Sequence, residues 1–153
     1  MRALELRVPP LVVVAAFAAM MVGLSWAAPA LSFVVRGREA IALLLLLAGA
    51  LVALAGVIAF RQNRTTVNPM TPGNATTVVS GGVYQYSRNP MYLGFLMALA
   101  ALALYLSNLG AALLLPGFVM YMNRFQVEPE ERALLGKFGA PYAAYMASVR
   151  RWL

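Results

Sequence analysis

The sequence predicts an all-α integral membrane protein with about four transmembrane helices, a polar loop on one side of the membrane and interfacial helices at the C-terminus. Two observations predict this fold class. Of the 153 residues, 62% are hydrophobic and only 11% are charged, whereas a soluble domain usually carries roughly 25% charged residues. The apolar residues also gather into four runs. So few charges cannot cover the surface of a water-soluble fold, and we interpret residues 1–153 as a single membrane domain.

The four apolar runs are the predicted membrane spans, and they comprise residues 10–33, 40–60, 91–107 and 109–124. About 20 apolar residues are needed to cross a bilayer as a helix, and the first two runs reach that length. The last two are shorter, and only Asn108 and Leu109 could form the tip between them, so they are expected to form a tight antiparallel hairpin. Pro116 predicts a kink in the fourth span, because proline removes a helical hydrogen bond.

The first two runs each leave an alternative. Arg2 and Arg7 before the first run, and residues 27–30 (Ala-Ala-Pro-Ala) near its end, also fit a signal peptide; we treat the run as the first span. In the second run, Gly49 and Gly56 would allow close helix packing. Because they lie seven residues apart, which is a weak pattern, we interpret them as filler.

The basic residues predict how the chain is oriented. With four spans, both termini and the long segment between spans two and three share one side. The other side holds only Arg36 and Arg38. The positive-inside rule places the richer side in the cytoplasm, here of a bacterial inner membrane, and explains the net charge of +7 without a nucleic-acid partner. The basic residues of that side are Arg2, Arg7, Arg61, Arg64, Arg88, Arg124, Arg132, Lys137, Arg150 and Arg151.

Two polar segments, residues 61–90 and 125–153, are predicted to form a cytoplasmic cap. The first is rich in threonine, asparagine, proline and glycine, which is typical of turns, and a loop this long is uncommon unless it is functional or disordered. Its apolar residues predict that it packs, namely Val78, Val79, Val83, Tyr84 and Tyr86. The second segment contains two short helical stretches divided by Gly139, whose apolar faces suit the membrane surface or the end of the bundle.

Polar side chains are expected to meet where the third and fourth spans enter this cap. An antiparallel hairpin brings Arg88, Asn89 and Tyr92 close to Arg124 and Gln126. Three carboxylates follow directly in the sequence, Glu128, Glu130 and Glu131. Structural roles explain part of this pattern, since asparagine favours a helix N-cap and acidic residues favour a helix N-terminus. A polar cluster at one end of an apolar bundle nevertheless indicates a ligand site.

The composition excludes several kinds of chemistry. The sequence contains no cysteine and no histidine, and therefore offers no disulfide, no thiolate or imidazole metal site and no histidine base. We expect no metal. Any reaction must use arginine, glutamate, tyrosine, asparagine and backbone groups.

The segment from Gly81 to Gly94, with Arg88-Asn89-Pro90-Met91-Tyr92 at its centre, resembles the signature of the isoprenylcysteine carboxyl methyltransferase family and its phospholipid methyltransferase relatives. The resemblance continues through Glu130-Glu131 to the terminal Arg150-Arg151-Trp152 and covers residues 61–153. The family often has histidine where this chain has Asn89, which removes any role that needs an imidazole. The resemblance implies a membrane enzyme that binds S-adenosylmethionine on the cytoplasmic side and takes a lipophilic methyl acceptor from the bilayer.

The same resemblance implies which residues contact the cofactor. Glu130 would hold its ammonium group or ribose hydroxyls, while Asn89 and Tyr92 would hold its carboxylate. Apolar side chains of the loop would flank the adenine. The full set is Asn68, Thr77, Val78, Val79, Gly82, Tyr84, Asn89, Pro90, Tyr92 and Glu130.

Methyl transfer from a sulfonium needs alignment of the two reactants and exclusion of water more than it needs a strong base. A carboxylate acceptor requires only an orienting group, for which Arg124 is the first candidate and Gln126 and Arg88 are the next. An amine acceptor must lose a proton, for which Glu128 or Glu131 is the candidate. The absence of histidine favours a carboxylate acceptor.

Other functions stay open at this point. One is N-methylation of a phospholipid or other amine. A second is a non-enzymatic transport or assembly protein, which predicts polar residues midway along the spans, where this sequence has none. A third is a reductase, which predicts a dinucleotide site, but the glycine fingerprint of such a site is missing.

Overall fold

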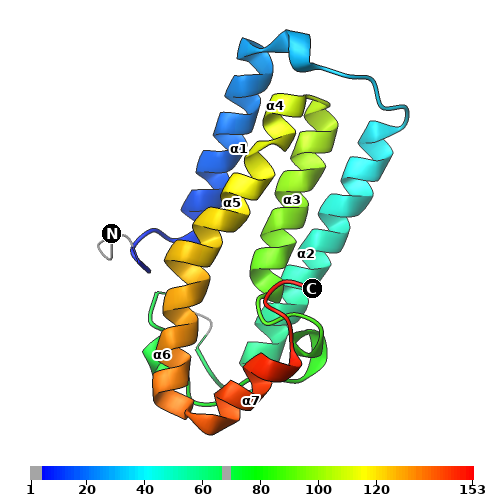
Figure 1. The fold of residues 1–153 in the computed structure, drawn as a ribbon. Helices are drawn as coiled ribbons and strands as arrows, with labels where there is room; N and C mark the ends of the chain where they lie inside the picture. The colour runs from blue at the N-terminus through cyan, green and yellow to red at the C-terminus, as the bar shows by residue number, and fades with distance from the viewer. Residues whose placement is uncertain (1–4, 67–69) are drawn as a thin grey trace.

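The computed structural model describes residues 5–66 and 70–153, and these residues form a bundle of helices (Figure 1). Helices α1, α2, α3 and α5 run alongside one another. The connection between α1 and α2 lies at one end of the bundle together with α4, and the opposite end holds α6, α7 and the C-terminus. An all-α fold is thereby confirmed for the described residues. The helices are α1 (Pro10–Ala27), α2 (Arg38–Gln62), α3 (Pro90–Leu106), α4 (Leu109–Ala112), α5 (Leu114–Met122), α6 (Glu128–Phe138) and α7 (Ala140–Ser148).

Among the described residues, α1 and α2 are the helices long and apolar enough to cross a membrane, with mean hydropathies of 2.0 and 2.9. Both expose large apolar side chains, including Leu11 and Leu44. Helix α2 matches the predicted second span, but the first helix ends at Ala27 rather than at residue 33. The reason is Pro29, because a proline disfavours helical backbone in the residue before it.

Close packing of α2 against α3 depends on glycines. A Cβ atom placed on Gly49 would lie 2.8 Å from the carbonyl oxygen of Gly94 and 2.9 Å from Cβ of Met97. A Cβ on Gly56 would lie 2.9 Å from Cγ of Met91. The interpretation of Gly49 and Gly56 as filler is therefore wrong: both let the backbones of the two helices approach closely, as small residues do between membrane helices.

Polar contacts fix the turn between α3 and α4. Ser107 ends α3 with a φ of +46°, and the side-chain oxygen of Asn108 accepts a hydrogen bond from the backbone of Ala111 (3.2 Å). The amide nitrogen of Asn108 donates to the carbonyl of Ala28 (2.9 Å), which ties this turn to the end of α1. The hairpin turn thus lies one residue earlier than predicted, at Ser107 and Asn108.

The predicted fourth span, residues 109–124, is interrupted at Leu113, between α4 and α5. This interruption lies three residues before Pro116 and agrees with the predicted kink, because a proline ring clashes with the helical carbonyl four residues earlier. The span also does not end at residue 124. A π-helical segment, Asn123–Val127, leads directly into α6, so α6 continues the line of α5 beyond the bundle (Figure 1).

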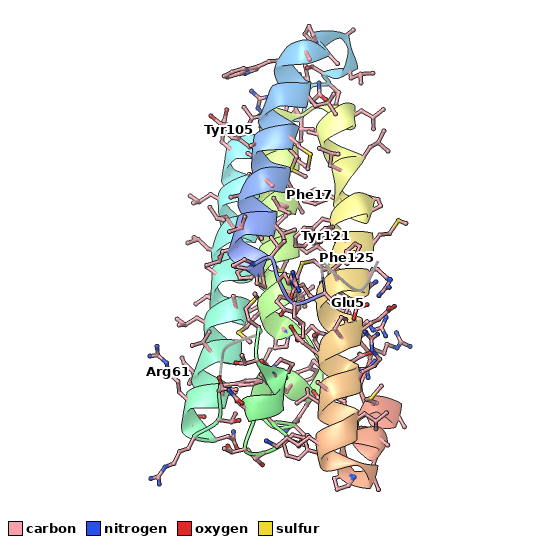
Figure 2. The ribbon with its side chains drawn as sticks, turned by 90° about the vertical axis from the view of Figure 1, so that its left-hand side faces the viewer. Glu5, Phe17, Arg61, Tyr105, Tyr121 and Phe125 are labelled. Atoms are coloured by element: carbon pink, nitrogen blue, oxygen red, sulfur yellow. The ribbon has the colours of Figure 1, made fainter. Side chains whose placement is uncertain are left out.

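The N-terminal segment lies beside this π-helical segment. The backbone N–H of Leu6 donates to the carbonyl of Phe125 (3.0 Å), and a π-helical turn leaves such backbone groups available. Glu5 forms an ion pair with Arg124 (2.8 Å). Figure 2 shows Glu5 beside Phe125, where the described chain begins. The N-terminal segment therefore stabilises the junction between α5 and α6.

The loop between α2 and α3 packs into a small core of its own, as the sequence predicted, but the predicted anchor Tyr86 is exposed and lies outside this core. Val79 and Tyr84 of the loop are buried with Ala59 of α2 and with Tyr142 and Tyr145 of α7. The hydroxyl of Tyr145 donates to the backbone carbonyl of Tyr84 (2.8 Å). This core holds the loop and α7 at the end of the bundle.

Candidate active site

A pocket lies between the end of α2, the start of α3, the loop that joins them and helices α6 and α7. The empty space, counted with the solvent at its mouth, is about 790 Å³. Most of the lining side chains are apolar or aromatic, with a few charged groups among them. The lining residues are Phe60, Thr66, Pro72, Ala75, Thr77, Val78, Val79, Tyr84, Arg88, Asn89, Met91, Tyr92, Glu130, Glu131, Leu134, Tyr142 and Tyr145.

Tyr92 and Glu130 meet in this pocket. The hydroxyl of Tyr92, in the first turn of α3, donates a hydrogen bond to Oε1 of Glu130, in the first turn of α6. Burial raises the pKa of Glu130 to about 8; the hydrogen bond from Tyr92 lowers this pKa and the charge of Glu131 raises it further. A carboxyl group that titrates near neutral pH can hold a cation or exchange a proton.

Glu131 lies between two arginines. Arg151 donates to it twice, from Nε to Oε1 (3.2 Å) and from Nη2 to Oε2 (2.7 Å). Arg88 approaches with Nη2 alone, 3.2 Å from Oε1. The side chains of Arg88 and Glu131 are 10% and 9% exposed. Within the described part of the chain, Nε and Nη1 of Arg88 are buried without a hydrogen-bond partner, and both can therefore bind a further group in the pocket.

The C-terminal residues are tied to the segment that precedes α3. The backbone N–H of Arg88 donates to the carbonyl of Arg150 (3.0 Å), and Nδ2 of Asn89 donates to the carbonyl of Arg151 (2.9 Å). The Asn89 side chain therefore makes no capping hydrogen bond to α3, although asparagine at this position was expected to favour an N-cap. It anchors the C-terminal segment beside the pocket.

Aromatic rings close the pocket around Tyr84. Its hydroxyl is buried and has no hydrogen-bond partner among the described residues, and its ring packs against Phe60 at a centroid distance of 5.2 Å. Burial raises the pKa of the Tyr84 phenol well above its ordinary value. Burial also raises the pKa of Tyr142 to about 12, helped by the charge of Glu131. Both phenols therefore stay protonated at neutral pH and can donate a hydrogen bond to a ligand.

The structure gathers most of the predicted cofactor contacts. Gly82 and Pro90 do not line the pocket: Gly82 starts a 3₁₀ turn, Gly82–Gln85, with a φ of +61°, and Pro90 is the buried first residue of α3. Asn68 lies outside the described residues. The other seven line the pocket, namely Thr77, Val78, Val79, Tyr84, Asn89, Tyr92 and Glu130.

The predicted catalytic residues are divided by the structure. Arg88 and Glu131 line the pocket, but Arg124 and Gln126 do not. Arg124 is paired with Glu5, and Nε2 of Gln126 donates to the carbonyl of Val8 (2.6 Å). Both side chains serve the N-terminal segment, because the π-helical turn aims them toward it rather than toward the pocket.

Sequence reasoning missed several members of the site. Arg151 was expected only as a cytoplasmic basic residue and as part of a terminal motif, and Phe60 lies inside a predicted span. Tyr142 and Tyr145 were expected in a helical stretch that lies on the membrane surface or over the end of the bundle, and the structure places them at the end of the bundle. Their i, i+3 spacing puts both rings on one helical face. That spacing could have shown that the two rings cover a common site.

The fold and the pocket define an all-α protein with long apolar helices and a small-molecule site at one end of the bundle. A family profile described as phospholipid methyltransferase matches residues 38–140, which is more than half of the chain. The chain therefore belongs to the phospholipid methyltransferase family, whose members are membrane methyltransferases that use S-adenosylmethionine.

A shorter relative is also recognisable. An uncharacterized protein of Haemophilus influenzae is 44% identical to this chain over 63 residues, which are 41% of this chain and the whole of the relative. No solved structure matches the chain.

Proposed function

We propose that this protein is an S-adenosylmethionine-dependent membrane methyltransferase that acts on a small lipophilic acceptor. The observation that carries the proposal is the pair of Arg88 and Glu130 in one pocket. Arg88 has two buried N–H groups without a protein partner in the described chain. Glu130 uses Oε1 to accept the hydrogen bond from Tyr92, and its other oxygen, Oε2, can accept from a ligand. A free amino-acid group, with its carboxylate and its ammonium, needs this combination of charges.

In this proposal the cofactor's amino-acid end lies between these two residues. The open N–H groups of Arg88 take its carboxylate, and Glu130 takes its ammonium. Asn89 and Tyr92 are less suited to the carboxylate than the sequence suggested, because the amide of Asn89 donates to Arg151 and the hydroxyl of Tyr92 donates to Glu130. Both instead hold the charged residues in place.

The nucleoside end fits the rest of the lining. Val78, Val79 and Leu134 provide apolar walls for adenine, and the buried Tyr84 hydroxyl has hydrogen-bonding capacity for a ribose or adenine atom. Gly82 and Pro90 act by shaping the loop and the start of α3. A contact from Asn68 stays a prediction.

The cofactor supplies a methyl group on a sulfonium, which is activated toward displacement. The protein must hold the acceptor in line with that group and exclude water, which lowers the barrier through alignment and desolvation. The rings of Tyr92, Tyr142 and Tyr145, all buried, favour a dry site.

A carboxylate is the favoured acceptor. It is already ionised at neutral pH and is attracted by the positive sulfonium, and the chain offers no histidine as a base. Both oxygens of Glu131 are engaged by arginines, so its carboxylate serves to hold these side chains. Arg124 and Gln126 have no place in this scheme, because their side chains bind the N-terminal segment.

A second candidate is methylation of an amine, as in a phospholipid headgroup. The raised pKa of Glu130, about 8, favours this alternative, because a carboxylate with this pKa can accept a proton from an ammonium group.

The chemical stability of the product separates the two candidates. The purified protein in lipid vesicles receives methyl-labelled S-adenosylmethionine with either a long-chain carboxylic acid or phosphatidylethanolamine. We expect the label on the acid, and we expect alkali to release it as methanol, because esters hydrolyse and N-methyl groups do not. Alkali-stable label on the lipid amine would favour the second candidate. Failure to bind S-adenosylhomocysteine in calorimetry would instead favour a non-enzymatic protein.

We further propose four membrane crossings, with the pocket on the cytoplasmic side of a bacterial inner membrane. Helix α3 and the α4–α5 stretch supply the third and fourth crossings beside α1 and α2. Arg61 projects outward at the pocket end of α2 (Figure 2), as a basic side chain at a cytoplasmic interface does. Arg36 and Arg38 lie at the other end of that helix, where basic residues are fewer. In this arrangement α6 and α7 lie at the cytoplasmic interface.

A further inference from the structure

The two arginines around Glu131 share it unequally. Arg151 reaches both carboxylate oxygens, whereas Arg88 approaches Oε1 alone, through Nη2. Arg88 lines the pocket, and its other two N–H groups are buried without a partner in the described chain. The arginine nearest the pocket is therefore the one that is left incompletely paired.

A guanidinium and a carboxylate prefer two parallel hydrogen bonds, and an unpaired buried donor is costly. Without the Arg151 side chain, both oxygens of Glu131 would be available to Arg88. Arg88 would then gain by turning toward Glu131, and its N–H groups would be used within the protein. Arg151 opposes this because its Nε and Nη2 already hold the two oxygens in the parallel geometry that Arg88 would need.

We infer that Arg151 is a positioning residue: by holding both oxygens of Glu131, it keeps the N–H groups of Arg88 open for the carboxylate of the cofactor. The inference rests on the proposed function, in which Arg88 binds that carboxylate. Arg151 itself does not line the pocket and touches no ligand there.

The side chain of Arg151 can be changed without releasing the C-terminal segment. The carbonyl of Arg150 accepts from the backbone of Arg88, the carbonyl of Arg151 accepts from Asn89, and the indole N–H of Trp152 donates to Asn123 (2.9 Å). None of these bonds uses the Arg151 guanidinium. The guanidinium also lies 3.9 Å from Oε1 of Glu128, so a substitution there tests the ion pairs of Arg151 and not the attachment of the C-terminus.

The test compares two ligands of the purified full-length protein by calorimetry. S-adenosylhomocysteine carries the amino-acid end, and 5′-methylthioadenosine lacks it. We expect Arg151→Gln to weaken S-adenosylhomocysteine binding about tenfold, the scale of a charge-assisted hydrogen bond, and to leave 5′-methylthioadenosine binding unchanged. Arg150→Gln is the matched control, since that side chain is exposed, and it should change neither affinity.

A second variant distinguishes positioning from simple structural support. The double variant Arg151→Gln/Glu131→Gln lacks the carboxylate that would capture Arg88. We therefore expect it to regain the preference for S-adenosylhomocysteine over 5′-methylthioadenosine that Arg151→Gln loses. An equal loss for both ligands in Arg151→Gln, or no loss for either, would overturn the inference. If Arg88→Gln itself leaves the preference unchanged, the proposed role of Arg88 is wrong and the inference falls with it. Continued binding of both ligands would then still support a cofactor site.

Discussion

Glu130→Ala is expected to weaken S-adenosylhomocysteine binding about 10- to 100-fold, which corresponds to the loss of one charge-assisted hydrogen bond of about 1.5–3 kcal/mol. Glu130 is the carboxylate that the pocket presents beside Tyr92, and its removal leaves the ammonium of the ligand without a partner. Arg124→Ala is the matched control. Arg124 pairs with Glu5 outside the pocket, so its loss should leave the affinity within about twofold of wild type. Calorimetry on the three proteins measures both effects, and equal affinities would contradict the assignment.

The pH dependence of the same binding provides an independent check. Because the pKa of Glu130 is raised to about 8, the carboxyl group is mostly protonated at about pH 6.5, and only its ionised form attracts an ammonium. Affinity for S-adenosylhomocysteine should therefore rise about tenfold from about pH 6.5 to about pH 8 in the wild type. Glu130→Gln cannot ionise and should show a flat profile. A rise of the same size in this variant would assign the titration to another group.

Gly94→Ala is expected to destabilise the bundle by about 1–3 kcal/mol or more, as overpacking of a tight contact does. A Cβ on Gly94 would meet the backbone carbonyl of Gly49 and would lie 2.7 Å from Cβ of Ala53. Neither neighbour is the flexible end of a side chain, so α2 and α3 must separate. The pocket would change as well, because Phe60 of α2 and Tyr92 of α3 both line it.

Gly23→Ala in α1 is the control for this effect, because a Cβ there meets nothing within 4 Å. Alanine in a helix is favoured over glycine by about 0.5–1 kcal/mol, so this variant should unfold at the same or a higher temperature than wild type. Thermal unfolding in detergent measures both variants. Equal midpoints for Gly94→Ala and wild type would show that the helices adapt to the added methyl group.

Much of the site followed from local sequence. Two polar segments lie at predicted helix starts: the hexapeptide around Arg88 and Asn89, and the acidic pair Glu130-Glu131. The first residues of both helices were therefore expected at the cap. Antiparallel hairpin geometry then predicted that Tyr92 would meet these carboxylates. This part was predictable because helix periodicity and chain reversal act over few residues.

The side chains that lie away from their predicted positions bind partners far away in the chain. Arg124 and Gln126 were assigned to the pocket, but a π-helical turn carries the helix on into α6 and directs both side chains to the N-terminal segment. Their partners, Glu5 and Val8, lie more than a hundred residues earlier, where no periodic pattern connects them. The roles of Gly49 and Gly56 failed for the same reason, since the meaning of a small residue depends on what packs against it.

The sequence by itself determined the apolar helices, the turn-rich cap and the types of chemical groups available, because composition and periodicity set these without reference to neighbours. Only the tertiary structure decided which charges share the pocket. Arg88 and Glu131 face it, Arg124 does not, and Arg151 reaches Glu131 across 20 residues of sequence. Which side chains reach the pocket depends on their directions in packed helices. The π-helical segment Asn123–Val127 is enough to turn the side chains of Arg124 and Gln126 to another face.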